Sequence, residues 1–110
     1  MKHLTAEMRE CIQNCLNCHA VCLSMASTHC LEMGGEHVQP QHFRLMLDCA
    51  QICQTAADFM LRKSPHHPHL CSECAEICRL CADDCERMGD MDDCVEACRK
   101  CALTCGAMAA

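Results

Sequence analysis

The chain is 110 residues long, with 16 cysteines, no tryptophan or tyrosine and a formal net charge of −6, so we expect one domain over residues 1–110. The acidic balance, without a basic cluster or an aromatic platform, excludes nucleic acid and an anionic membrane surface as partners. The sequence has no apolar run of about 18 residues and no apolar segment in its charged N-terminus, so we predict a reduced, cytoplasmic protein without a membrane span.

The first predicted helix covers residues 5–33, with Thr5 as its N-cap and Gly34-Gly35 as its end. Because residues three and four apart lie on the same side of an α-helix, its thiols should form one row. The cysteines of this row are Cys11, Cys15, Cys18 and Cys22, with Cys30 eight residues further on.

The second predicted helix covers residues 40–63, from Pro40, a favoured first-turn residue, to just before Ser64-Pro65. This helix is poor in thiols. Its inward row reads His42, Met46, Cys49, Cys53, Ala56 or Ala57, and Met60. We interpret the histidines at 66, 67 and 69 as a solvated connection.

The third and fourth predicted helices cover residues 69–88 and 91–108. The third carries five cysteines spaced 3, 4, 3, 4, which are Cys71, Cys74, Cys78, Cys81 and Cys85. The fourth repeats this pattern with Cys94, Cys98, Cys101 and Cys105, between Met91 and Met108. Carboxylates between the cysteines, Asp84 among them, should form a solvated outer face.

Four helices with short connections, each with one row, predict an all-α fold, an antiparallel up-down-up-down four-helix bundle with a cysteine-lined core. Cysteines along one helix have Cβ atoms about 5–6 Å apart, farther than the roughly 3.5–4.5 Å of a disulfide. Leucine, isoleucine and alanine fill helical cores better than cysteine, so packing alone does not account for the rows. The rows therefore predict metal binding.

The spacing also indicates which metal binds. Soft thiolates select Cu(I), zinc or iron–sulfur clusters. The C-x2-C-x2-C-x3-C-P run of bacterial ferredoxins is absent, and the commonest unit is CxxxC. With metal–sulfur bonds of about 2.3 Å, two sulfurs about 4.5 Å apart hold one Cu(I) almost linearly, and i,i+4 side chains can reach this separation.

Charge balance extends this prediction to many ions. An isolated Cu(I) bis-thiolate has one negative charge, which is unfavourable in a low-dielectric core, so thiolates should be shared between metals. We therefore predict multiple Cu(I) ions, near or above one per cysteine, with protons released on binding.

The CxxxC units, which recur from Cys11 to Cys105 in all four predicted helices, resemble those of the bacterial four-helix-bundle copper storage proteins, specifically the cytosolic branch. The resemblance implies storage of many Cu(I) ions inside the bundle and a homotetramer. A copper chaperone or acceptor is a further expected partner. Some members have histidines in the connection between helices three and four that mark the mouth for copper. Here residues 87–93 contain methionine and aspartate instead.

Two sets of residues follow as candidate sites. The metal ligands are Cys11, Cys15, Cys18, Cys22, Cys30, Cys49, Cys53, Cys71, Cys74, Cys78, Cys81, Cys85, Cys94, Cys98, Cys101 and Cys105. The residues expected where metal enters, at one end of the bundle, are Met33, His37, His42, Met46, Met88 and Met91. We expect His19 and His29 to be exposed or hydrogen-bonded in the core.

No Glu-x-x-His pair of the di-iron bundle type and no nucleophile with an orienting base is present, so we predict no enzymatic activity. Storage of Cu(I) has two alternatives. One is a zinc or general thiol buffer, and the other is a redox sensor whose thiols pair between helices.

Overall fold

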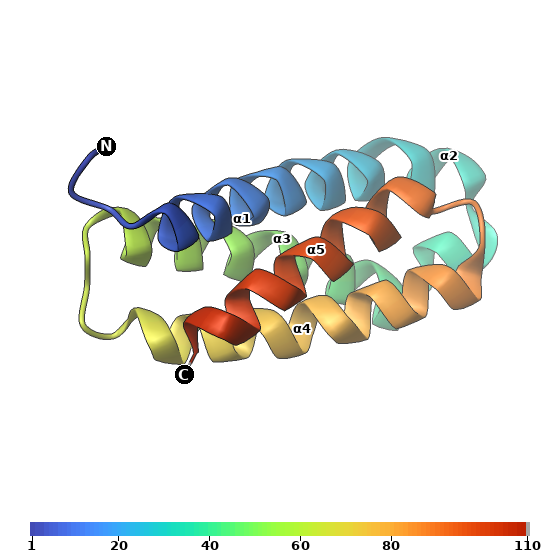
Figure 1. Cartoon of the computed structure of the whole chain (residues 1–110). Helices are drawn as coiled ribbons and strands as arrows, with labels where there is room; N and C mark the ends of the chain where they lie inside the picture. Colours follow the sequence, from blue (N-terminus) through green and yellow to red (C-terminus); the bar gives the residue numbers. More distant parts are fainter. Residues whose placement is uncertain (110) are drawn as a thin grey trace.

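Four long helices run antiparallel along one axis in the structure, a computed structural model that describes residues 1–109 (Figure 1). They are α1 (Ala6–Met25), α3 (Pro40–Leu61), α4 (His67–Met88) and α5 (Asp92–Met108), and the described residues contain no strand. The neighbouring pairs are α1/α3, α3/α4, α4/α5 and α1/α5. This arrangement confirms the predicted up-down-up-down bundle, which measures 45 × 22 × 18 Å.

The first predicted helix, 5–33, contains a π-helical turn that we did not expect. Thr5 caps α1, because its hydroxyl accepts a hydrogen bond from the Met8 backbone N–H at 3.1 Å. After α1 come the π-helical segment η1 (Ala26–Cys30) and the single turn α2 (Leu31–Met33). The left-handed backbone at Gly34, with φ of 66°, then ends the helix.

The π-helical turn explains why Cys30 reaches the core. Eight residues of regular α-helix would rotate Cys30 by about 80° from Cys22. A π turn contains one more residue than an α-helical turn. The eight residues from Cys22 to Cys30 therefore span the same rotation as seven residues of α-helix, which is nearly two full turns and returns to the same face. Cys30 is accordingly fully buried.

The other helices differ from prediction only near their ends. The 3-10 segment η2 (Gly35–Val38) fills a connection for which we predicted no helix. Helix α3 ends slightly before the predicted residue 63, since Lys63 adopts a left-handed backbone with φ of 51°. Helix α4 begins slightly before residue 69, with Pro68 in its first turn. Asp92 and Asp93 lie in the first turn of α5, where the helix dipole favours negative charge.

The core consists of the thiol rows and small residues between them. All 16 cysteines are buried, and buried alanines such as Ala56, Ala57 and Ala97 lie among them. Of the apolar side chains outside the rows, Ile12 is buried, whereas Leu80 and Leu103 are 54% and 78% exposed. Within residues 1–109, the helices are all too short or too polar to cross a membrane.

The two ends of the bundle are formed by different segments of the chain. The α2 end comprises residues 25–46 and 81–94, and the N-terminal end comprises residues 1–11, 57–71 and 101–109 (Figure 1). Leu4 is 3% exposed at the N-terminal end, and its carbonyl accepts a hydrogen bond from the Arg9 guanidinium at 2.6 Å. The carbonyl of Met1 accepts another from Arg9 at 3.1 Å. Leu4 therefore belongs to the buried core at this end of the bundle.

Candidate metal centre

Thiols from all four long helices meet on the bundle axis. The sulfur of Cys15 in α1 lies 3.4 Å from that of Cys105 and 3.7 Å from that of Cys101, both in α5. The sulfur of Cys53 in α3 lies 3.6 Å from those of Cys74 and Cys78 in α4. Because these contacts join different helices, the sulfurs form one network instead of separate pairs along each helix.

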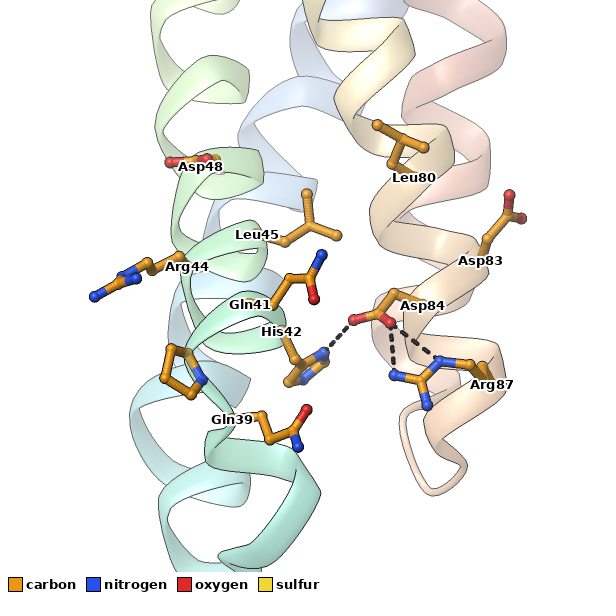
Figure 2. Close-up of a pocket in the computed structure, with 11 residues that line it drawn as sticks. Gln39, Gln41, His42, Arg44, Leu45, Asp48, Leu80, Asp83, Asp84 and Arg87 are labelled. Atoms are coloured by element: carbon orange, nitrogen blue, oxygen red, sulfur yellow. Dashed lines mark hydrogen bonds and ion pairs between the residues drawn. The ribbon is translucent and has the colours of Figure 1, made fainter.

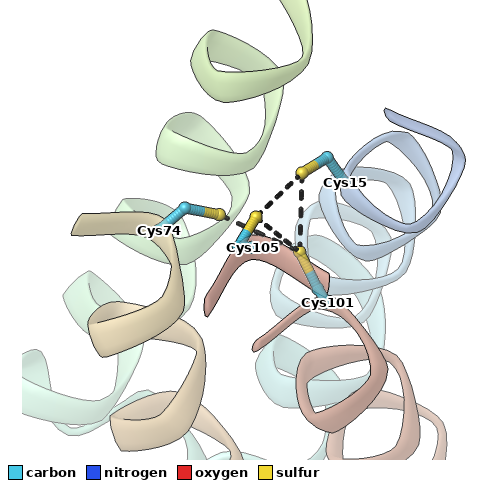
Figure 3. Close-up of side chains that lie close together, drawn as sticks. All are labelled: Cys15, Cys74, Cys101 and Cys105. Carbon is cyan, nitrogen blue, oxygen red and sulfur yellow. Dashed lines mark hydrogen bonds between the residues drawn. The ribbon is translucent and has the colours of Figure 1, made fainter. Parts of the chain in front are cut away.

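Groups of three or four thiols repeat along this network. In the group formed by Cys15, Cys74, Cys101 and Cys105, all four sulfurs lie within 4.8 Å of one another (Figure 3). Groups of the same compactness are Cys53/Cys74/Cys78/Cys101, Cys18/Cys49/Cys53/Cys78, Cys18/Cys22/Cys49/Cys98 and Cys11/Cys71/Cys105. Neighbouring groups share members, so metals that fill them must share thiolates.

The sulfurs are closer together than linear coordination requires. The i,i+4 pairs Cys18–Cys22, Cys74–Cys78 and Cys101–Cys105 have sulfur–sulfur distances of 3.9, 3.8 and 3.9 Å. A linear Cu(I) would separate them by about 4.5 Å, whereas three sulfurs around one ion lie about 4 Å apart for bonds of about 2.3 Å. The metal-free distances therefore lie near the value for three sulfurs around one ion, and sulfurs of neighbouring helices are close enough to offer a third ligand. Linear coordination by these pairs stays a prediction.

The thiols in one group do not ionise independently. Hydrogen bonds from Cys105 and Cys15 lower the pKa of Cys101, and the hydrogen bond with Cys101 raises the pKa of Cys105. The directions are opposite because a second buried thiolate would lie beside the charge of the first. An ion that binds the whole group must therefore displace protons.

Methionine thioethers join the network at the α2 end. The sulfur of Met46 accepts hydrogen bonds from Cys85 at 3.4 Å and Cys81 at 3.6 Å. The sulfur of Met91 accepts one from Cys30 at 4.0 Å. The sulfur of Met25, which we did not predict as a site residue, accepts one from Cys94 at 3.3 Å. Its position three residues after Cys22 is the sequence signal for this contact.

His42 connects these sulfurs to a carboxylate. It is 2% exposed, and its Nδ1 donates to Asp84 of α4 at 2.6 Å, as Figure 2 shows. The other ring nitrogen, Nε2, lies 3.8 Å from the sulfur of Cys30. A proton held on Nδ1 by a carboxylate leaves the Nε2 lone pair free for a metal, as in carboxylate–histidine–metal triads.

The prediction that Asp84 belongs to a solvated face is wrong. Asp84 also accepts a hydrogen bond from Arg87 at 2.8 Å. Burial raises the pKa of Asp84, but hydrogen bonds from Arg87 and His42 outweigh it and hold that pKa below its usual value. Asp84 and His42 line a groove of about 1010 Å³ between α3 and α4 (Figure 2). The ionised carboxylate therefore orients the imidazole between this groove and the thiol network.

The remaining predicted residues at the α2 end lie in different surroundings. Met33 is 50% exposed, and Met88 is half-buried against the core. His37 is 8% exposed. Nδ1 of His19 donates a hydrogen bond to the Ala50 carbonyl at 2.7 Å, which agrees with one of the two surroundings expected for this histidine. His29, by contrast, is half-buried, and its Nε2 is buried without a hydrogen-bond partner.

Comparison with known proteins identifies relatives over nearly the whole chain. The family model described as copper storage protein matches residues 4–110. Among solved structures, the Nmul_A1745 protein from Nitrosospira multiformis is 50% identical, with a TM-score of 0.92 and 94% of each chain covered. The Cu(I)-bound copper storage protein BsCsp3, of Bacillus subtilis, is 34% identical, with a TM-score of 0.85 and coverage of 94% of this chain and 99% of that one.

A third solved structure describes a cytosolic copper storage protein from Streptomyces lividans with five coppers. It is 27% identical, with a TM-score of 0.80, and the alignment covers 94% of this chain and 92% of that chain. Among curated proteins, none matches the chain.

Proposed function

Since the chain belongs to the copper storage protein family, we propose that it stores and buffers multiple Cu(I) ions on the thiolates that line its core. The observation that carries this function is the continuous thiol network, in which 16 buried cysteines from four helices lie in overlapping groups. Family membership favours Cu(I) storage over the zinc buffer and the redox sensor. The protein acts as a store, and not as a catalyst.

Charge balance determines the capacity of this store. Each Cu(I) ion neutralises one thiolate, so a filled core with one ion per cysteine has no net charge. Fewer ions would leave buried thiolates uncompensated or protonated, and a buried unpaired charge is costly. The 16 cysteines therefore hold about one ion each.

Metal enters at the α2 end, through Met33, His37, His42, Met46, Met88 and Met91. Two features support this choice. The thioethers of Met46 and Met91 contact thiols there, and Asp84 orients His42 toward Cys30. Replacing Met33, Met46, Met88 and Met91 together by leucine should slow loading without changing capacity. Unchanged loading kinetics would remove their role.

The protein functions in the cytoplasm, as one relative is a cytosolic copper storage protein. It self-associates as a tetramer through its outer apolar face, where Leu80 and Leu103 are largely exposed. A copper chaperone or acceptor exchanges metal with the store.

Anaerobic titration with Cu(I) against a competing chromophoric chelator tests the function. We expect saturation near one ion per cysteine, accompanied by proton release. Saturation near half this ratio would contradict shared thiolates, and preferential uptake of Zn(II) would favour the thiol buffer.

A further inference from the structure

We propose that His29 and His37 form a nitrogen-donor Cu(I) site at the α2 end, outside the thiol network, that passes copper through His42 to Cys30. This inference rests on the proposed storage function. It assigns to His29 a role opposite to the one expected from sequence, and it adds a ligand pair that contains no sulfur.

The two imidazoles lie together although they come from different elements. His29 belongs to the π-helical segment η1 and His37 to the 3-10 segment η2. Their ring centres are 5.5 Å apart, and the rings are nearly perpendicular, with an interplanar angle of 87°. When two imidazoles bind one ion through metal–nitrogen bonds of about 2.0 Å, their ring centres lie at most about 6 Å apart. The spacing of the pair therefore suits a single bound ion.

Both imidazoles have a nitrogen that protein groups leave unsatisfied. The Nε2 atoms of His29 and His37 are buried without a hydrogen-bond partner, and His37 as a whole is only 8% exposed. An unsatisfied buried polar atom costs about 1–3 kcal/mol, and most such atoms in folded proteins find a partner. A metal ion supplies the missing partner for both nitrogens.

Coordination by His29 and His37 suits transfer of Cu(I) to the core instead of storage. Imidazole binds copper readily, but it is neutral, so an ion on two imidazoles keeps its positive charge. Thiolates neutralise that charge, and an ion at the pair is therefore more stable once it moves into the core. The pair should hold Cu(I) more weakly than the thiols do.

A second step leads from the pair to the core. The ring centres of His37 and His42 are 6.3 Å apart, and Nε2 of His42 lies 3.8 Å from the Cys30 sulfur. With bonds of about 2.0 Å to nitrogen and about 2.3 Å to sulfur, one ion can contact both His42 and Cys30. The histidines thus form a sequence of donors that ends at the first thiol.

The π-helical turn makes this sequence possible. It contains both His29 and Cys30, and it returns Cys30 to the core while His29 lies beside His37. Such turns are rare and often mark functional sites.

Two variants with one matched control test the site. His29→Gln and His37→Gln remove one ligand each, and His69→Gln changes an exposed histidine at the N-terminal end. Initial loading from a weak Cu(I) complex is followed by the thiolate–copper absorption band. Because loss of even an outer-shell partner typically weakens metal binding about 10–100-fold, each variant should slow loading about tenfold. The double variant should slow it no further, since both ligands serve one ion.

A second measurement does not depend on the variants folding. In wild-type protein already filled to its thiol capacity, one further equivalent of Cu(I) should shift the ring 15N resonances of His29 and His37 but not that of His69. Unshifted resonances, loading rates equal to those of the control, or additive effects of the two variants would overturn the site. If the wild-type thiols do not take up Cu(I) at all, the storage function itself fails, and that outcome is distinct.

Discussion

Removing one i,i+4 cysteine pair distinguishes shared thiolates from isolated linear sites. Cys101 and Cys105 of α5 have sulfurs 3.9 Å apart and also contact thiols of other helices. Cys101 lies 3.7 Å from Cys15, 3.8 Å from Cys53 and 3.9 Å from Cys74, measured between sulfurs. We predict that the double variant Cys101→Ala/Cys105→Ala binds two fewer Cu(I) ions than the wild type.

The predicted loss of two Cu(I) ions follows from charge balance. The two thiolates contribute two negative charges, so a core that stays neutral without them binds two fewer Cu(I) ions. If the pair instead held a single linear Cu(I), its removal would lose only one ion. Each substitution also removes a buried sulfur and should destabilise the metal-free protein by about 1–2 kcal/mol, which leaves the bundle folded.

Capacity is measured by anaerobic Cu(I) titration against a chelator, with protein concentration checked by amino-acid analysis because the chain lacks tryptophan and tyrosine. The matched control is Ile12→Val, a substitution at a buried position outside the thiol rows. It should cost about 0.5–1.5 kcal/mol of stability and leave capacity unchanged. A loss of one ion from the cysteine double variant would refute the shared network.

Three further predictions concern other parts of the molecule. Asp84→Asn should slow Cu(I) loading severalfold at unchanged capacity, because His42 loses its anionic partner. Since the pKa of Asp84 is lowered in the folded state, the ionised carboxylate stabilises the fold at neutral pH, and this stabilisation is lost as the pH falls below about 4. The unfolding midpoints of variant and wild type should therefore converge at acidic pH. Lowering the pH from about 8 to about 6 should weaken Cu(I) retention in chelator competition, because protons compete for the thiolates; a pH-independent affinity would contradict binding by thiolates. Leu103→Lys, at a side chain 78% exposed, should reduce the mass found by light scattering if the outer apolar face mediates self-association, and an unchanged mass would exclude this position from the interface.

Local spacing was sufficient to predict the helices and the buried rows. The 3, 4, 3, 4 pattern of Cys71 to Cys85 places every thiol of α4 in the core, because side-chain direction along a helix depends only on residue separation. Cys30 was placed correctly although the spacing of eight does not fit a regular α-helix. The π turn that makes the placement correct has no signal in the pattern of cysteines.

Contacts between helices were not predictable in the same way. Asp84 and His42 are 42 residues apart and meet only because α3 and α4 pack side by side in one register. The short distances between sulfurs of different helices also depend on this register, so the cysteine spacing along one helix did not predict them. Periodicity shows which side of a helix faces inward, but it does not show which side chain of another helix lies opposite.

The most direct test of storage in the core is anomalous diffraction at the copper edge from crystals of the Cu(I)-loaded protein. We predict copper peaks along the bundle axis, from Cys11 at the N-terminal end to Cys94 at the α2 end. Each peak should have sulfurs of two or more helices around it. Copper confined to surface histidines, with no anomalous signal between the helices, would contradict the account.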